Sequence, residues 1–371
     1  METIPEHLRQ FVEEQDYAHY TSRDHAVWRY IMRQQVAHLK QVAHPVYLEG
    51  LKKTGIAIDH IPSIEEMNAA LSELGWRAVV VDGYIPAAAF MEFHSHKILP
   101  IALDMRTVEH IHYTPAPDIV HEAAGHAPFI ADIDYGEFLQ KFGEYGLKAI
   151  FTHKDQEIYE AIRTLSMIKE DPEAKMEKID LAEKDVLKKM GENYEPSEAA
   201  LLTRLFWWTA EYGLVGSVEN YKIFGAGLLS SIGEGHSCLQ NKVKKIPLTA
   251  DCIAQRFDIT TVQPQLFVTK SCKHMRQVLE EFADQMCFRV GGVASIKQAI
   301  DAGIVATCEY ASGLQVSGVF ASLNSQVMMS CMQKHFHTTL QIIINFFKIT
   351  LVPNVLIAPM AHVLVKRKKL L

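Results

Sequence analysis

The alternation of apolar and polar residues predicts helices along most of the chain. From residue 25 to residue 43, apolar positions recur three and four residues apart, which is the period of an amphipathic helix. Ser63 and Glu66 form a capping-box signature, so another helix is expected to begin there and to end near Gly75. The same reasoning predicts further helices over residues 47–54, 133–151, 154–170, 200–214 and 272–286.

Apolar and β-branched runs that could form strands are few and short. Residues 76–81 form one such run, which ends at the turn pair Asp82-Gly83, and residues 98–103 and 262–268 form two more. Because helices outnumber these runs, we expect a mainly α fold in which small, short β elements line one mouth of a helical domain.

Three segments of different composition divide the chain. Residues 1–23 are polar and are predicted to be an N-terminal arm, residues 24–292 form the main domain, and residues 293–371 form a partial or truncated C-terminal domain. No acidic residue follows Glu309 and the chain closes on a basic run, so the tail is aberrant in composition. Its apolar stretch is interrupted by lysine and proline, whereas a membrane span needs about 20 clean apolar residues. Membrane insertion is therefore not predicted.

Residues 170–199 carry many lysines and glutamates of mixed sign. Opposite charges four residues apart are typical of a solvated helix face. We expect this helix to project outward from the main domain, or to act as a lid if it covers a site.

The overall composition narrows the classes of protein. Apolar residues make up 48% and charged residues 22% of the 371-residue chain, as in ordinary soluble globular proteins. The net charge of −7 gives no reason to expect nucleic acid or an anionic membrane as a partner. All six cysteines lie at Cys238 or later without close pairs, which indicates reduced thiols in a cytoplasmic protein.

Two histidines offer candidate chemistry. His121 and His126 stand five residues apart, whereas the metal-binding pair of an H-E-x-x-H helix stands four apart and shares one face. Five residues turn an α-helix by about 500°, so both imidazoles can reach one ion only if the helix ends or bends between them. Gly125 would permit that change of direction. On spacing alone, a pair of buried, hydrogen-bonded histidines explains the pattern equally well.

Glu211 is the conspicuous acid of the apolar run 200–214. A carboxylate buried there without a partner would cost several kcal/mol, and a metal ion held with two neutral histidines would remove that cost. The alternative is a surface glutamate at the end of a helix. We predict that His121, His126 and Glu211 bind one metal ion, and that its open positions suit a non-haem Fe(II) that binds oxygen.

Residues 106–126 and 204–234 contain several motifs in a fixed order, including both histidines and the segment Trp-Trp-Thr-Ala-Glu-Tyr-Gly. From about Asp24 to Gly292 the chain resembles the tetrahydropterin-dependent aromatic amino acid hydroxylases, in particular a bacterial phenylalanine 4-monooxygenase-like branch. The resemblance implies the helical catalytic domain of that family and ring hydroxylation of an aromatic amino acid, with phenylalanine to tyrosine, in phenylalanine catabolism, as the favoured reaction. It also implies Fe(II), a tetrahydropterin such as tetrahydrobiopterin, and O2 as co-substrate.

The resemblance assigns five residues to the amino acid substrate. Arg106 matches the arginine that binds the substrate carboxylate through a planar, bidentate guanidinium, and a surface salt bridge is its alternative role. Trp207 matches the tryptophan on the wall of the ring pocket, although either of two adjacent tryptophans could belong to the core. Thr114, Pro117 and Ser230 match residues that line the same site.

Four residues match the pterin site of the family. Phe90 matches the phenylalanine that stacks on the pterin, and Glu122 matches the glutamate that faces pterin and water. Gly83 and Ile85 match a loop whose backbone runs past the cofactor. Pro100 replaces a polar residue of animal members, so the resemblance is weaker on that side.

Other functions stay open at the level of the sequence. One is a zinc-dependent hydrolase that uses Glu122 as its base, and another is a non-catalytic protein that binds a pterin or an amino acid. A nucleotide-binding loop at residues 225–231 is rejected because no clear strand precedes these glycines, so tight backbone packing near the metal is the better interpretation. The sequence does not predict the oligomeric state.

Overall fold

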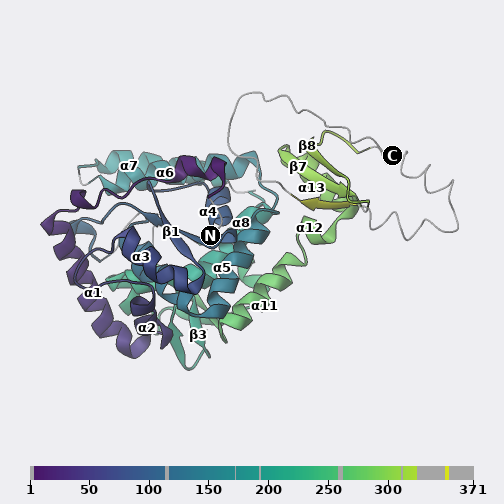
Figure 1. Cartoon of the computed structure of the whole chain (residues 1–371). Helices are drawn as coiled ribbons and strands as arrows, with labels where there is room; N and C mark the ends of the chain where they lie inside the picture. The colour runs from purple at the N-terminus through teal and green to yellow at the C-terminus, as the bar shows by residue number, and fades with distance from the viewer. Residues whose placement is uncertain are drawn as a thin grey trace, which may run out of the picture.

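Helices make up most of the structure, a computed structural model, and its strands are short (Figure 1). This confirms the mainly α fold with small β elements that the sequence predicts. The residues described by the structure are 4–112, 117–171, 173–191, 194–257, 262–310, 312–323 and, for the backbone, 347–350.

The helices follow the predicted periodicity closely. The capping box at Ser63 and Glu66 is present, and the helix after it begins at Ile64. The α-helices are α1 Ser22–Val42, α2 Val46–Lys53, α3 Ile64–Leu71, α4 Ala87–Ser95, α5 Ile133–Gly146, α6 His153–Glu170, α7 Met176–Met190, α8 Glu198–Phe206, α9 Ala226–Ser230, α10 Ile232–Ser237, α11 Cys272–Ala283, α12 Cys287–Val290 and α13 Gly292–Ala302.

The strands form three small sheets. In the first, β1 (Arg77–Val81) pairs in parallel with β2 (Ile98–Ala102). The second has the order β4-β3-β6-β5 and consists of β3 Leu214–Gly216, β4 Tyr221–Ile223, β5 Lys244–Pro247 and β6 Gln265–Thr269. The third has the order β8-β7-β9 and consists of β7 Val305–Tyr310, β8 Gln315–Val319 and β9 Phe347–Thr350.

One large apolar core lies among the helices of the main domain. Trp28, Phe138, Phe142 and Trp208 are fully buried in it. Its members include residues on both sides of His121 and on both sides of Glu211, so the two segments that carry the candidate ligands are fixed by the core itself.

The predicted N-terminal arm is attached to the main domain by apolar side chains. Leu8 is buried against Val79, Val81 and Phe93, in a small cluster beside β1 and α4. The backbone of Glu13 also bridges Val80 of β1. The sequence of residues 1–23 is polar overall, so its composition did not indicate these contacts. They hold the arm against β1 and α4.

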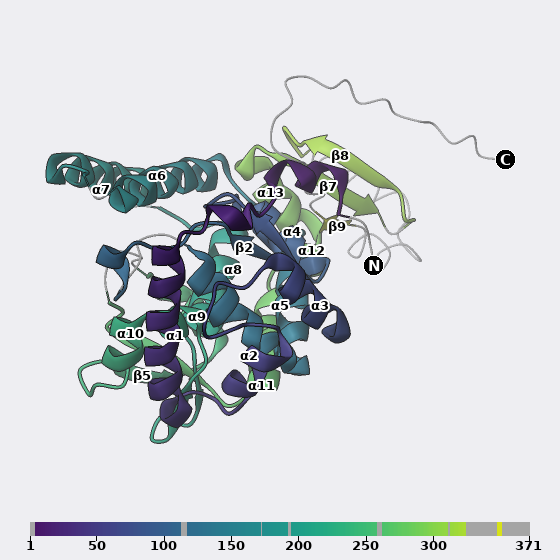
Figure 2. The same ribbon diagram turned by 60° about the vertical axis from the view of Figure 1, so that its left-hand side comes forward.

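Figures 1 and 2 show α13, β7 and β8 beyond α12 at the C-terminal end of the described chain, and this part has a small apolar cluster. Apolar residues of α13 and β7 pack there against Ile150 of the main domain. Most of the predicted aberrant tail lies outside the described residues, so its truncation stays a prediction. Among the described residues, every helix is too short or too polar to cross a bilayer.

The charged segment 170–199 contains α7, which packs against α6 as a hairpin, and Figure 2 shows this hairpin projecting from the domain, as predicted for the charged segment. Helix α6 buries Ile158, Ala161 and Leu165, whereas α7 has no buried residue among those described. A salt bridge of 2.8 Å between Lys169 and Glu183 joins the two helices. The outer helix therefore carries the solvated, charged face.

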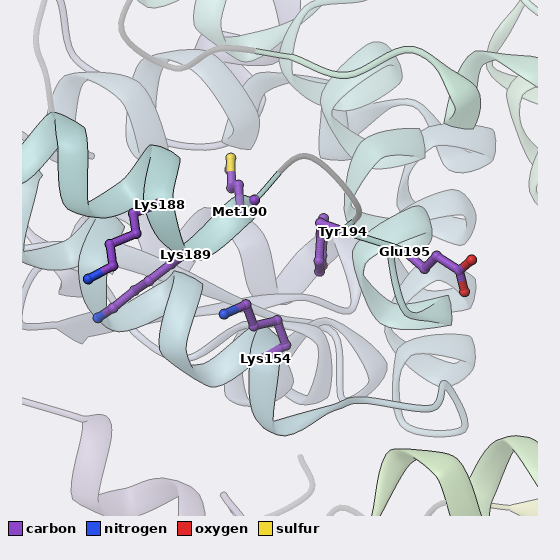
Figure 3. A pocket seen from close by; sticks show the side chains of 7 residues that line it. Lys154, Lys188, Lys189, Met190, Tyr194 and Glu195 are labelled. Atoms are coloured by element: carbon purple, nitrogen blue, oxygen red, sulfur yellow. The ribbon is translucent and has the colours of Figure 1, made fainter.

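A hollow of about 510 Å³ lies where the end of α7 approaches the start of α6 (Figure 3). Two of its three lysines are paired, Lys154 with Glu157 at 2.8 Å and Lys189 with Asp185 at 3.2 Å. None of the predicted site residues lines it. Its lining consists of Lys154, Lys188, Lys189, Met190, Gly191, Tyr194 and Glu195.

Candidate metal centre

The two histidines lie on one π-helix, Val120–His126. A π-helix closes its hydrogen bonds between residues five apart, so residues i and i+5 lie above one another. We expected the helix to end or bend between His121 and His126, and that expectation is wrong. The helix widens instead, and the wider turn brings both imidazoles to the same side.

Gly125 is needed for close packing and not for an unusual backbone angle. Its φ is not in the left-handed region. A Cβ added at Gly125 would lie 2.9 Å from both the Cβ and the carbonyl oxygen of Ala226. Helix α9 therefore approaches the π-helix so closely that only glycine fits between them, which corrects the reason predicted for this residue.

Glu211 ends a second π-helix, Trp207–Glu211, which continues directly from α8. The glycine-rich run 225–231 packs against its end. A Cβ at Gly225 would lie 2.4 Å from the carbonyl oxygen of Glu211, and one at Gly227 would lie 3.1 Å from the same atom. The interpretation of these glycines as tight backbone packing is thus confirmed.

The three candidate ligands meet at one point. Their ligand atoms all lie within 4.8 Å of one another. His121 Nε2 lies 3.1 Å from one carboxylate oxygen of Glu211, and His126 Nε2 lies 3.0 Å from the other. The side chains are only 16%, 2% and 12% exposed for His121, His126 and Glu211. Two imidazole nitrogens and a carboxylate fit a divalent transition metal such as iron.

Hydroxyl groups hold the outer nitrogen of each imidazole. Ser230 Oγ lies 3.1 Å from His121 Nδ1 and donates its own proton to the carbonyl of Ala226 at 2.8 Å. It therefore accepts a hydrogen bond from Nδ1–H, which directs the Nε2 lone pair of neutral His121 toward the cluster. Tyr135 Oη lies 3.4 Å from His126 Nδ1, so a hydroxyl also contacts the outer nitrogen of the second ring.

The charges of the cluster are strongly coupled. Burial raises the pKa of Glu211, but the imidazoles of His126 and His121 outweigh burial and hold it well below its usual range. Burial lowers the pKa of His121, but the Glu211 carboxylate outweighs it and raises that pKa to about 9. Without a metal, the cluster is therefore an ion pair, and an entering metal ion must displace a proton.

Two further carboxylates interact electrostatically with the cluster, Glu122 with all three candidate ligands and Glu234 with His121. Burial raises the pKa of Glu122, and its Oε2 is buried without a hydrogen-bond partner in the part of the chain that the structure describes. Burial also raises the pKa of Glu234 to about 7, while the hydroxyl of Tyr212 donates to it at 2.9 Å. Glu234 was not predicted as a site residue, since its position after a glycine-rich run gave no signal.

Arg106 is buried in a bidentate pair with Asp118. Its Nε and Nη2 donate to the two carboxylate oxygens at 2.6 and 2.7 Å, and Nη1 donates to the carbonyl of Ser230 at 2.9 Å. Asp118 also accepts the backbone N–H of His121 at 3.0 Å. The side chains of Arg106 and Asp118 are 0% and 2% exposed, so the surface salt bridge considered for Arg106 is wrong.

The two adjacent tryptophans differ in their surroundings. Trp208 is fully buried and donates its indole N–H to the carbonyl of Gln255 at 2.9 Å, so it is the core residue. Trp207 is partly buried and stacked between Tyr212 and Phe257, with ring centroids 4.6 and 4.2 Å apart. Its indole N–H has no partner among the described residues.

The remaining predicted site residues lie on α4, in the turn after β1 and near Asp118. Phe90 lies on α4, with its ring centroid 4.4 Å from that of His94 and 5.5 Å from that of Phe206. Gly83 has a φ of +59°, in a turn after β1. Ile85 packs against the small cluster beside the N-terminal arm. Pro117 is half-buried just before Asp118, and Thr114 lies outside the described residues.

Comparisons with known proteins agree on one family. The sequence model of the biopterin-dependent aromatic amino acid hydroxylases matches residues 9–176 and 174–291. The chain is 29% identical to the phenylalanine-4-hydroxylase of Pseudomonas aeruginosa over 269 residues, which cover 71% of this chain and 85% of that protein. It is 28% identical to the phenylalanine-4-hydroxylase of Mesorhizobium japonicum over 274 residues, which cover 73% and 83%.

A solved structure shares the fold. Phenylalanine hydroxylase from Chromobacterium violaceum with bound iron(III) and oxidized 7,8-dihydrobiopterin aligns with a TM-score of 0.56 and 23% identity, over 76% of this chain and 94% of that one. The fold and the cluster together define a helical protein with a two-histidine, one-carboxylate centre. The chain belongs to the biopterin-dependent aromatic amino acid hydroxylases. This membership does not favour the zinc hydrolase or the non-catalytic binder.

The first prediction concerns Gly125. We expect Gly125→Ala to lower the free energy of unfolding by about 1–3 kcal/mol, because its Cβ would meet Ala226 across a closely packed contact. Denaturant unfolding of the metal-free chain measures this. Gly318→Ala is the control, since a Cβ there has open space. Equal unfolding midpoints for the two variants would contradict the packing argument.

The second prediction concerns Tyr135. Tyr135→Phe should weaken binding of Co(II) or Fe(II) about tenfold, because His126 loses the hydroxyl that orients its ring. Competition with a chelator measures this affinity. Tyr145→Phe, on the same helix, removes a hydroxyl that bonds to Glu280 instead and should leave metal binding unchanged. An unchanged affinity in Tyr135→Phe would show that Tyr135 does not support the site.

The third prediction is a pH dependence of metal binding. Because His121 is protonated below its pKa of about 9, binding should release a proton from the cluster. The apparent affinity is then expected to rise about tenfold per pH unit as the pH increases from about 6 to about 8. Calorimetric titration in buffers of different ionisation enthalpy counts the protons released. An affinity that stays constant over this range would contradict the assigned ion pair.

Proposed function

We propose that this chain hydroxylates phenylalanine to tyrosine with Fe(II), a tetrahydropterin and O2. The observation that supports this most directly is the convergence of His121, His126 and Glu211 in a chain of the biopterin-dependent family. Relatives from Pseudomonas aeruginosa and Mesorhizobium japonicum are phenylalanine-4-hydroxylases. Tyrosine and tryptophan are the competing substrates, because a few side chains of the pocket decide between such rings.

In this proposal His121, His126 and Glu211 would hold the iron. When bound, iron and pterin together supply the activation of O2, which side chains alone do not provide. The protein fixes the geometry. Ser230 and Tyr135 orient the imidazoles, and the core keeps the carboxylate of Glu211 between them.

Arg106 would bind the carboxylate of the amino acid. Three of the five donors of its guanidinium bond to described residues, and the two donors that make no such bond would bind the substrate. Asp118 keeps the guanidinium plane in place while it does so. Trp207, stacked between two rings, would form the wall beside the substrate ring, and Ser230, Pro117 and Thr114 would line the rest of the pocket.

The pterin would lie between Phe90 and the loop at Gly83 and Ile85. Stacking on an apolar ring contributes about 1 kcal/mol. Glu122 supplies a carboxylate oxygen that has no partner among the described residues, and it would accept a hydrogen bond from the pterin or from water. That unsatisfied oxygen supports the cofactor role of Glu122 over a purely structural one.

The division of the chain follows from the same proposal. Residues 24–292 are the catalytic unit, residues 1–23 an arm, and residues 293–371 a partial C-terminal domain outside the chemistry. The family match ends at residue 291, which supports the boundary at residue 292, and it begins at residue 9, inside the arm. We further propose a cytoplasmic protein of phenylalanine catabolism, which suits the buried free thiols at Cys238, Cys252, Cys272, Cys287 and Cys308.

The fourth prediction tests the proposed function. The wild-type chain loaded with Fe(II) should form tyrosine from phenylalanine when given tetrahydropterin and O2. Glu211→Gln removes the only carboxylate of the ligand cluster, so we expect iron affinity to fall more than about 100-fold and tyrosine formation to disappear with it. Product analysis and an iron assay on the same samples measure both effects.

The control for this experiment is Glu219→Gln, the same substitution at an exposed acid eight residues further along the chain. It should retain both iron and activity. Full hydroxylation by Glu211→Gln, or activity with zinc and without iron in the wild type, would refute the proposal.

A further inference from the structure

The α6–α7 hairpin contacts the loop that is proposed to bind the pterin. The hydroxyl of Tyr159, on α6, donates to the backbone carbonyl of Tyr84 at 2.8 Å. The two tyrosine rings also lie near each other, with centroids 6.2 Å apart. Tyr84 stands between Gly83 and Ile85, so the hairpin reaches the middle of that loop.

The N-terminal arm also packs against this loop. Ile85 packs against the cluster that contains Leu8, and Leu8 is only 1% exposed. His7 Nε2 lies 2.8 Å from the carboxylate of Glu92, on the helix that carries Phe90. The arm therefore contacts both the loop and α4, and the hairpin contacts the loop.

Residues 82–86 of this loop belong to no helix or strand. Gly83 has a positive φ and no atom within 4 Å of the place where a Cβ would lie. Asp82 before it is exposed. A loop of this kind depends on contacts from neighbouring elements. Contacts that keep the loop in its binding conformation raise the fraction of molecules that are ready to bind the cofactor. The apparent affinity for the cofactor rises in proportion to that fraction.

We propose that α6 is a positioning element for the cofactor loop and that Tyr159 is the residue through which it acts. This inference rests on the proposed function, because it takes residues 83–85 as part of the pterin site. It gives the hairpin between His126 and Glu211 a role in cofactor binding, in place of that of a passive surface insertion. Tyr159 is a positioning residue, since its hydroxyl reaches the backbone of the loop and not the reacting groups.

The test compares two conservative variants of the full chain. Tyr159→Phe removes the hydrogen bond to the loop. Tyr194→Phe is the matched control, because the Tyr194 hydroxyl also attaches α6 to the rest of the chain, at 3.0 Å from Asp155, without contacting the loop. The two readouts are the affinity for 7,8-dihydrobiopterin, titrated into the metal-loaded chains, and the amide hydrogen exchange of residues 83–86 without ligand.

We expect Tyr159→Phe to bind the pterin about fivefold more weakly, which is the effect of losing one ordinary hydrogen bond. Its loop amides should exchange faster, its KM for the pterin should rise, and its kcat at saturating pterin and its KM for phenylalanine should stay unchanged. Tyr194→Phe should match the wild type in all of these.

The outcomes distinguish a failure of the proposed function from a failure of the positioning role of α6. If the wild-type chain does not bind the pterin at all, the proposed function fails. If the wild type binds it and Tyr159→Phe binds equally well with unchanged loop exchange, the function stands and the positioning role of α6 is refuted. Equal weakening in Tyr159→Phe and Tyr194→Phe would also refute it, because the effect would then come from the stability of the hairpin and not from the loop contact.

Discussion

The rest of the structure depends on the interaction between the buried carboxylate of Glu211 and two imidazoles. Isolating such a charge from water costs several kcal/mol unless a partner compensates it. In this chain the partners are His121 and His126, which reach it because each segment leaves the ordinary α-helical turn. Two π-helices, one for both histidines and one for the glutamate, present three side chains to one point. Wide turns of this kind are often found at functional sites.

Close packing keeps the two wide turns in place. Helix α9 lies against both of them, with Gly125 facing Ala226 on one side and Gly225 facing the backbone of Glu211 on the other. No larger residue than glycine fits at these contacts. The Arg106–Asp118 pair adds a polar link, since Asp118 also binds the first turn of the histidine helix and Arg106 also binds Ser230. Ligands, orienting hydroxyls and the proposed substrate-binding arginine therefore belong to one connected unit.

The sequence predicted the elements whose signals are local. The capping box at Ser63 predicted α3, and the β-branched run before Asp82 predicted β1. The candidate ligands came from two motifs and a family resemblance, and the structure brings them together. The π-turn was missed because a 3.6-residue period places His121 and His126 on different faces, and only tertiary packing widens the helix. Tyr135 looked like an ordinary helix residue, since its contact with His126 depends on how α5 follows the site. The contact of Tyr159 with Tyr84 was equally invisible, because it joins residues 75 positions apart in the chain.

The central claim is that one metal ion is held by His121, His126 and Glu211. Its most direct test is a crystal structure of the chain loaded with Co(II), with anomalous diffraction measured at the cobalt absorption edge. The account predicts a single strong peak bonded to the Nε2 atoms of both histidines and to the Glu211 carboxylate. A peak elsewhere, or a bound cobalt that lacks any of these three ligands, would contradict it.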